Sequence, residues 1–164
     1  MTLKDRTAVV GIGATPYYKR GQSPPQSELE LACRTILLAL DDAGLGLRDL
    51  DGFALYASSC DPAQVASVLG LPEVRFAATL TSGGGGSAGA LGLAAAAITS
   101  GQAEVCVTLM TLHARMISDP LCLYDYTMEN DGAVAAIVTS AERARDLRHP
   151  PVYVMGSAHG ALGH

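Results

Sequence analysis

Aromatic and charged residues are both scarce in this sequence of 164 residues. Tryptophan is absent, aromatic residues make up 5% and charged residues 16% of the chain, whereas hydrophobic residues make up 49%. Small side chains must therefore dominate the packing, which predicts close approach between backbone segments. The mean hydropathy of +0.25 is high for one domain of this size. We therefore expect an oligomer or a partner chain to cover part of the surface.

Basic patches, metal-ligand motifs and long apolar runs are also missing. The formal net charge is -5 and lysine and arginine are dispersed, which argues against nucleic-acid binding. No apolar run reaches the ~20 residues of a membrane-spanning helix, and no signal peptide is recognisable. The cysteines form neither a CxxC pair nor a cluster with histidine, so we expect no bound metal and a reduced, cytoplasmic setting; they are Cys33, Cys60, Cys106 and Cys122.

Segments typical of strands and helices alternate along the first two thirds of the chain. Strands are expected over residues 7–13, 51–57, 75–80 and 103–110. Helices are expected between them, one from the N-cap Ser27 to Gly44, one over residues 61–70 and one over residues 86–100. The third helix is apolar on nearly every face, so it must be buried on all sides. One sheet can cover only one side, so we expect a second layer from another half or another chain.

The pattern changes after Met110. Residues 113–131 have no clean period and are predicted to form an irregular connection. A strand over residues 132–140, a short charged helix over 141–148 and a strand over 152–157 follow, before a tail at 158–164. We therefore predict a single α/β domain over residues 1–164, with the order βαβαβαββ and a mixed, mostly parallel sheet.

A run of four glycines precedes the apolar helix. Bare backbone N–H groups at the start of a helix attract negative charge, so this turn could bind an anion or an oxyanion. Alternatively, the glycines form a tight turn that lets the helix pack closely on the sheet, and the sequence leaves both interpretations open. The candidate substrate-binding residues are Ser82, Gly83, Gly84, Gly85, Gly86 and Ser87.

Several other residues are weaker candidates. Gly11 and Gly13 follow the first apolar run as in a dinucleotide-binding motif, but the third glycine and the acidic residue of that motif are missing. His113 could act as a general base, although we interpret it as a loop histidine. We interpret the others as structural residues of a strand, a loop or the tail; they are Cys106, Cys122, Tyr124, Asp125, Glu129, Asp131, His159 and His164.

The order of four segments resembles the thiolase superfamily, and within it the lipid-transfer, sterol-carrier branch. These segments are VVGIGATP, SELELACRTILLALDDAGL, LGLAAAAITSGQAEVCV after the glycine turn, and ENDGAVAAIVTSAERARDL. The resemblance covers nearly the whole chain, but only as the amino-terminal half of a protein built from two such halves. It implies a βαβαβαββ unit whose glycine- and alanine-rich helix lies between stacked layers.

The chain departs from the family pattern in three places. Gly84 stands where a thiolase has its nucleophilic cysteine, so the catalytic residues are unknown. The lid that the family inserts between the strands near Met110 and Gly132 is nearly all missing. The second half, which carries the family's histidine motif, has no counterpart after His164.

The resemblance implies a protein directed at acyl-CoA that lacks the thiolase nucleophile. The expected chemistry is retro-aldol cleavage of a β-hydroxyacyl-CoA in sterol side-chain or lipid degradation, with acyl-CoA as substrate and no cofactor bound by the chain. The resemblance also implies partners, namely a homodimer or a separate second half, and a zinc-containing OB-fold protein. The alternative is a non-catalytic half that binds acyl-CoA or lipid, or that scaffolds a complex.

Overall fold

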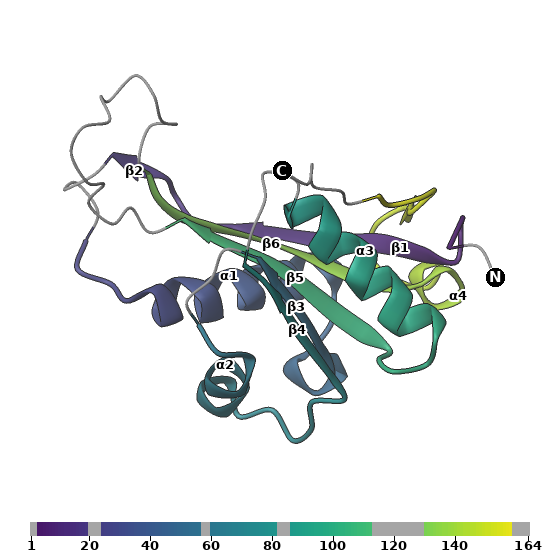
Figure 1. Ribbon diagram of the computed structural model, residues 1–164, viewed down its shortest axis with the longest axis horizontal. Coiled ribbons are helices and arrows are strands. Elements are labelled where there is room, and N and C mark those ends of the chain that lie inside the picture. The colour runs from purple at the N-terminus through teal and green to yellow at the C-terminus, as the bar shows by residue number, and fades with distance from the viewer. Residues whose placement is uncertain (1–2, 20–23, 57–59, 82–85, 113–129, 159–164) are drawn as a thin grey trace, which may run out of the picture.

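The computed structural model describes residues 3–19, 24–56, 60–81, 86–112 and 130–158. A central sheet separates two helical layers, with α1 and α2 on one face and α3 on the other (Figure 1). The α1 face holds the larger part of the core, which includes Leu31, Phe53 and Ile137. A smaller cluster, which includes Ala54, Ala94 and Val138, lies under α3.

The sheet is mixed, as predicted, and its main strands follow the order β4-β3-β5-β6-β1-β7. Strand β3 pairs in parallel with β4 and β5, whereas β6 pairs antiparallel with β5 and β1, and β7 antiparallel with β1. Strands β1, β3, β4 and β5 therefore point the same way. The strands are β1 (Thr7–Ala14), β3 (Gly52–Tyr56), β4 (Phe76–Leu80), β5 (Val105–Leu112), β6 (Asn130–Ser140) and β7 (Val152–Tyr153).

The helices α1 (Glu28–Ala43) and α2 (Pro62–Leu69) begin and end where their capping residues predict. The hydroxyl of Ser27 accepts a hydrogen bond from the Glu30 N–H, which caps the start of α1. Gly44, at φ 73°, ends α1 in the left-handed conformation that glycine adopts without strain. Local sequence signals therefore determine both helices.

The glycines of β1 serve packing rather than dinucleotide binding. A Cβ on Gly11 would lie 2.5 Å from the Ala39 carbonyl oxygen, and one on Gly13 would lie 2.4 Å from that of Thr35. Both glycines lie within the strand and face α1, so they permit α1 to approach the backbone of β1. The dinucleotide interpretation is wrong for this pair.

Asp51 joins the start of β3 to the start of β5. Its carboxylate accepts hydrogen bonds from the backbone N–H groups of Glu104 at 3.0 Å and Val105 at 2.9 Å. The guanidinium of Arg75, which stands just before β4, lies 3.3 Å from the same carboxylate. One side chain therefore fixes the relative positions of three parallel strands. A short 3-10 helix, η1 (Leu47–Asp49), precedes it.

Strand β2 (Tyr18–Lys19) was not predicted, because the sequence there reads as a polar loop. It pairs with the beginning of β6, so that Tyr18 is opposite Asp131 and Lys19 is opposite Asn130. Asp131 therefore belongs to a strand, and the prediction that it forms a turn before the strand is wrong. Pairing with a distant segment, rather than local propensity, creates this short strand.

Helix α4 (Ala141–Ala144) and strand β7 are shorter than predicted. The segment after α4 makes contacts with the end of α1 instead, since the Arg148 side chain donates to the Asp41 carbonyl. The His149 ring nitrogen also lies 3.1 Å from the Asp42 carboxylate. Beyond β7, the Ser157 hydroxyl donates to the Ala88 carbonyl of α3. The segments after α4 and after β7 therefore make tertiary contacts with α1 and α3, and they do not continue as a regular helix or strand.

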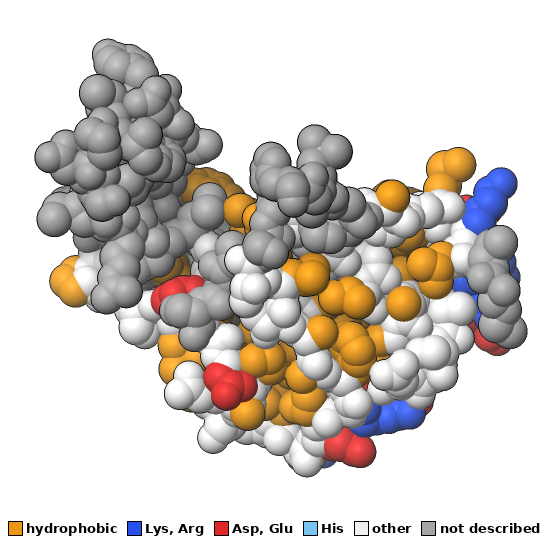
Figure 2. Space-filling model, viewed as in Figure 1, with side chains coloured by type: hydrophobic (Ala, Val, Ile, Leu, Met, Phe, Trp, Pro, Cys, Tyr) orange, Lys and Arg blue, Asp and Glu red, His pale blue; other side chains and the backbone are white. Residues whose placement is uncertain are grey.

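Helix α3 (Gly86–Thr99) is buried on one side only. Ala90 and Ala94 pack on the sheet and are no more than 1% exposed, whereas Ala88 and Ala96 are exposed and Leu91 is half-buried. Hydrophobic side chains gather on the face of the molecule where α3 lies (Figure 2). The residues that the structure describes therefore do not bury α3 on all sides. No helix in the described ranges is long and apolar enough to cross a membrane.

Candidate functional site

The glycine run leads into the amino end of α3, at the carboxyl edge of the parallel strands. Ser82, Gly83, Gly84 and Gly85 lie outside the described residues, so their role in substrate binding stays a prediction. Gly86 and Ser87 are the first two residues of α3. The backbone N–H groups of a first helical turn have no partner within the helix and attract negative charge.

Tyr56, the last residue of β3, packs directly against Gly86. A Cβ on Gly86 would lie 1.8 Å from Cε2 and 2.6 Å from Cζ of the Tyr56 ring. Any larger residue at position 86 would therefore overlap the ring. The interpretation of the glycine turn as a device for close packing is supported at this one position.

A hollow of about 260 Å³ opens beside this contact, between α3 and strands β5 and β6. None of the described residues that line it is ionisable; they are Ser87, Ala90, Thr108, Leu109, Met110, Val134, Ala135 and Ala136. The Thr108 hydroxyl donates to the Ala136 carbonyl at 3.4 Å, so the sheet already uses that donor. The hollow can accept a non-polar group next to the positive end of the α3 dipole.

Two of the described cysteines, Cys33 and Cys106, are unsuited to nucleophilic attack. Cys106 lies inside β5 with no exposed surface, and its burial, together with the charge of Asp51, raises the pKa of its thiol strongly. Burial and the neighbouring Cys60 raise the pKa of the Cys33 thiol as well. Because the thiolate is the reactive form, these shifts disfavour reaction. Cys106 is therefore a small buried hydrophobic residue, as predicted.

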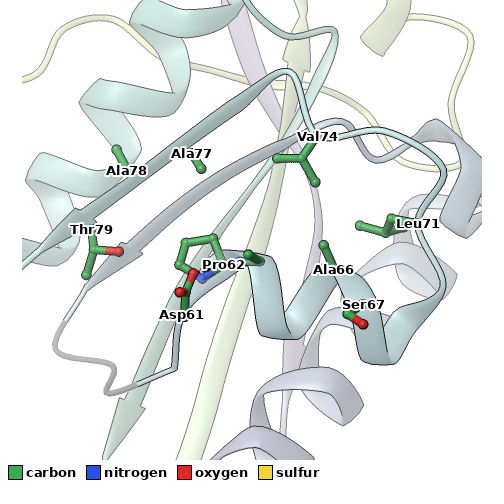
Figure 3. Close-up of a pocket in the computed structure, with 10 residues that line it drawn as sticks. Asp61, Pro62, Ala66, Ser67, Leu71, Val74, Ala77, Ala78 and Thr79 are labelled. Carbon is green, nitrogen blue, oxygen red and sulfur yellow. Dashed lines mark hydrogen bonds between the residues drawn. The ribbon is translucent and has the colours of Figure 1, made fainter.

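A larger hollow of about 580 Å³ lies on the other side of the sheet, between α2 and β4 (Figure 3). Asp61 is the only acidic residue among the described residues that line it, and its carboxylate accepts a hydrogen bond from the Ala63 N–H at 2.8 Å. This carboxylate therefore caps α2 and has no catalytic neighbour among the lining residues. Across the described parts of the chain, no three histidine, cysteine or acidic side chains gather as metal ligands would.

The remaining candidates from the sequence lie outside the described residues; they are His113, Cys122, Tyr124, Asp125, Glu129, His159 and His164. The sequence did not single out Tyr56, although its hydroxyl is the one polar group in the strand GFALY and stands at the carboxyl end. That position in a parallel strand is where functional side chains of α/β proteins gather. This signal was available but is weak on its own.

Two curated relatives match nearly the whole chain, although no protein-family model matches it. A steroid side-chain-cleaving aldolase from Thermomonospora curvata is 26% identical over 249 residues, covering 97% of this chain and 63% of the relative. A 17-hydroxy-3-oxo-4-pregnene-20-carboxyl-CoA lyase from Mycobacterium tuberculosis is 27% identical over 248 residues, covering 96% of this chain and 64% of the relative. The chain thus spans less than two thirds of these relatives. The first alignment is also longer than this chain of 164 residues, so that relative contains segments without a counterpart here.

Solved structures also match the fold, over most of this chain and about half to two thirds of the matched chains. The Ltp2-ChsH2(DUF35) aldolase superposes with a TM-score of 0.85 at 27% identity, covering 99% of this chain and 63% of the matched one. A monomeric SCP2-thiolase like protein type 1 from Mycobacterium smegmatis superposes with a TM-score of 0.64 at 18% identity, covering 89% of this chain and 48% of the matched one. The second match shows the fold alone. Together these matches confirm the predicted α/β architecture.

Proposed function

We propose that this chain, a thiolase-like protein of the lipid-transfer branch, takes part in retro-aldol cleavage of a β-hydroxyacyl-CoA during steroid side-chain degradation. The observation that carries this proposal is the pair of aldolase and lyase relatives that match over 97% and 96% of the chain. Gly84 at the family's nucleophile position supports it, because a retro-aldol reaction needs no thioester to the enzyme.

The proposed reaction divides into two proton movements and one bond cleavage. A base removes the proton of the β-hydroxyl group, the Cα–Cβ bond breaks to give a ketone or an aldehyde, and the electron pair moves into the thioester as an enolate. The enolate then takes a proton at Cα. The N–H groups at the start of α3 would stabilise the negative oxygen, and the hollow beside Ser87 would hold a non-polar part of the substrate.

Partner chains belong to this proposal. The described residues that line the hollow include no ionisable side chain, so the base would come from another part of the chain or from a partner. The exposed face of α3 also favours a covering layer, because burying apolar surface yields about 25 cal/mol per Å². A second half or a second copy of the chain would supply that layer. The Ltp2-ChsH2(DUF35) aldolase combines two proteins, and we propose a zinc-containing OB-fold protein as the second partner here.

A non-catalytic role is the second candidate, and it is favoured because no described residue that lines the hollow is ionisable. Here the chain would bind acyl-CoA or lipid, or scaffold a complex, without breaking a bond. The two candidates separate when ketone and aldehyde release from β-hydroxyacyl-CoA is measured with the chain alone and with its partners. Product from the chain alone would exclude scaffolding. No product, even from the complete assembly, would exclude the lyase.

A further inference from the structure

The apolar hollow between α3 and strands β5 and β6 is deepest at Ala136. We propose that Ala136 is a specificity-determining residue, because its small side chain leaves the space that binds an alkyl group on Cα of the acyl-CoA. This inference rests on the proposed retro-aldol function. It names the residue that limits how long an alkyl branch at Cα can be.

Three side chains of β6 face α3, and the middle one is the smallest. Val138 belongs to the buried cluster under α3. Side chains two positions apart along a strand point to the same face of the sheet, so Ala136 and Val134 face α3 as well. Alanine lacks the two methyl groups of valine, and this face of β6 therefore has a depression at Ala136.

Strand β5 gives the hollow an outer and an inner level. Thr108 is directly opposite Ala136, and Met110 is directly opposite Val134. Strand β5 runs toward the edge of the sheet where α3 begins, so Met110 and Val134 lie at the mouth. Thr108 and Ala136 lie two residues deeper, which is about 7 Å along the strands.

Helix α3 forms the third side, and the core closes the inner end. Ser87 lines the mouth in the first turn, and Ala90 lies three residues further along the helix, or about 4.5 Å deeper. The next facing pair of β5 and β6 is Cys106 and Val138, and neither has any exposed surface. A group that enters from the mouth therefore reaches Ala136 and can go no further.

The volume of the hollow limits the size of that group. One water-sized group occupies ~30 Å³, so about 260 Å³ holds roughly eight such groups. A four-ring steroid nucleus is roughly twice as large on this scale and would extend out of the mouth. A short alkyl group fits.

The chemistry of the lining indicates which part of the substrate enters. The thioester oxygen would lie at the N–H groups of the first turn of α3, beside Ser87. The chain beyond the sulfur carries amide groups, which are costly to bury without hydrogen-bond partners. The β-hydroxyl group needs a base, and no described residue that lines the hollow is ionisable. An alkyl group on Cα is the remaining non-polar part next to the carbonyl.

Ala136→Leu tests the inference in the assembled complex, with Ala77→Leu in β4 as the matched control, since Ala77 is exposed and does not line this hollow. The substrates are β-hydroxyacyl-CoA thioesters with hydrogen, methyl, ethyl or propyl at Cα and the same group at Cβ. One methylene group in a hydrophobic pocket changes kcat/KM by roughly 10–200-fold. We therefore expect the ratio of kcat/KM for the propyl and the unsubstituted substrates to fall by about tenfold or more in Ala136→Leu. The ratio in Ala77→Leu should equal that of the wild type.

Two further measurements separate selectivity from folding and from bond cleavage. Ala136→Gly deepens the hollow, so it should raise the same ratio; a ratio between two substrates does not depend on the fraction of folded enzyme. Acyl-CoA thioesters with the same alkyl groups but no β-hydroxyl group cannot be cleaved. Their dissociation constants, measured by titration calorimetry, should show the same loss of selectivity in Ala136→Leu.

The outcomes separate the two claims. If the wild-type complex cleaves its substrates and Ala136→Leu keeps the wild-type ratio, or loses activity equally toward all four, the inference is overturned and the proposed function stands. If the wild-type complex cleaves none of them, the proposed function fails and the binding measurement decides the inference. A dissociation constant that rises with alkyl length only in Ala136→Leu then supports it, and the same dependence in the wild type and the variant overturns it.

Discussion

The contact of Gly86 with Tyr56 makes a quantitative prediction about stability. In Gly86→Ala the new methyl group would lie 1.8 Å from Cε2 of the ring. Carbon atoms in good contact are about 3.5–4.0 Å apart. The ring or the helix must therefore move by roughly 2 Å, and overpacking of this kind costs about 1–3 kcal/mol. The better helix propensity of alanine offsets at most about 1 kcal/mol.

Urea denaturation followed by circular dichroism measures the free energy of unfolding of each variant. We expect Gly86→Ala to lose up to about 2 kcal/mol, which is the overpacking cost of about 1–3 kcal/mol less a gain in helix propensity of about 1 kcal/mol. The matched control is Gly156→Ala, since a Cβ on Gly156 has no atom within 4 Å and its backbone is not left-handed. This control should stay within about 0.5 kcal/mol of the wild type.

A double-mutant cycle isolates the contact. Tyr56→Ala removes the ring, so adding Gly86→Ala in that background should cost little or even stabilise the helix. Equal costs of Gly86→Ala with and without the ring would refute the reasoning, because the loss would then come from some other neighbour of Gly86.

Three further predictions follow from the other contacts. Asp51→Ala should lower the free energy of unfolding by about 2–3 kcal/mol and Asp51→Asn by less, because two backbone N–H groups lose a charged acceptor. Urea denaturation measures this loss, and an unchanged free energy of unfolding in Asp51→Ala would contradict the prediction. The Ile12 N–H, chiefly, and then His149 hold the pKa of Asp42 below its ordinary value. The ionised Asp42 carboxylate therefore stabilises the fold fully above about pH 4, and this stabilisation is lost as the pH falls through the lower folded-state pKa. In Asp42→Asn the free energy of unfolding should fall less steeply with decreasing pH below about pH 4. An unchanged slope would disprove this. Cys33 and Cys106 should resist a thiol reagent at pH 8 in the folded chain and react after unfolding in urea; labelling of either in the folded chain, located by peptide mass spectrometry, would count against their burial.

Local signals predicted the parts of the fold that local chemistry determines. Ser27 and Gly44 bound α1 because a hydroxyl and a left-handed glycine complete its first and last turns. Strand β2 could not be predicted this way, because it exists through pairing with β6. The contact of Arg148 with the end of α1 likewise joins segments far apart in the sequence, and no local pattern reveals it.

The candidate site was predicted only in outline. The four glycines before an apolar helix indicated a tight turn or an anion site, and the structure assigns packing to Gly86. The partner in that contact, Tyr56, lies thirty positions earlier in the chain, and only the parallel pairing of β3 with its neighbours brings it to α3. The packing partner of Gly11 and Gly13 could not be predicted either. The sequence shows that small residues are needed at these positions, but not that α1 is the helix that packs against them.

The most direct test of the central claim is the quantification of both products after β-hydroxyacyl-CoA is incubated with the chain, the proposed second half and the proposed OB-fold partner. The proposed retro-aldol reaction predicts a ketone or aldehyde and a shortened acyl-CoA in equal amounts. Absence of both products from the complete assembly would contradict the claim.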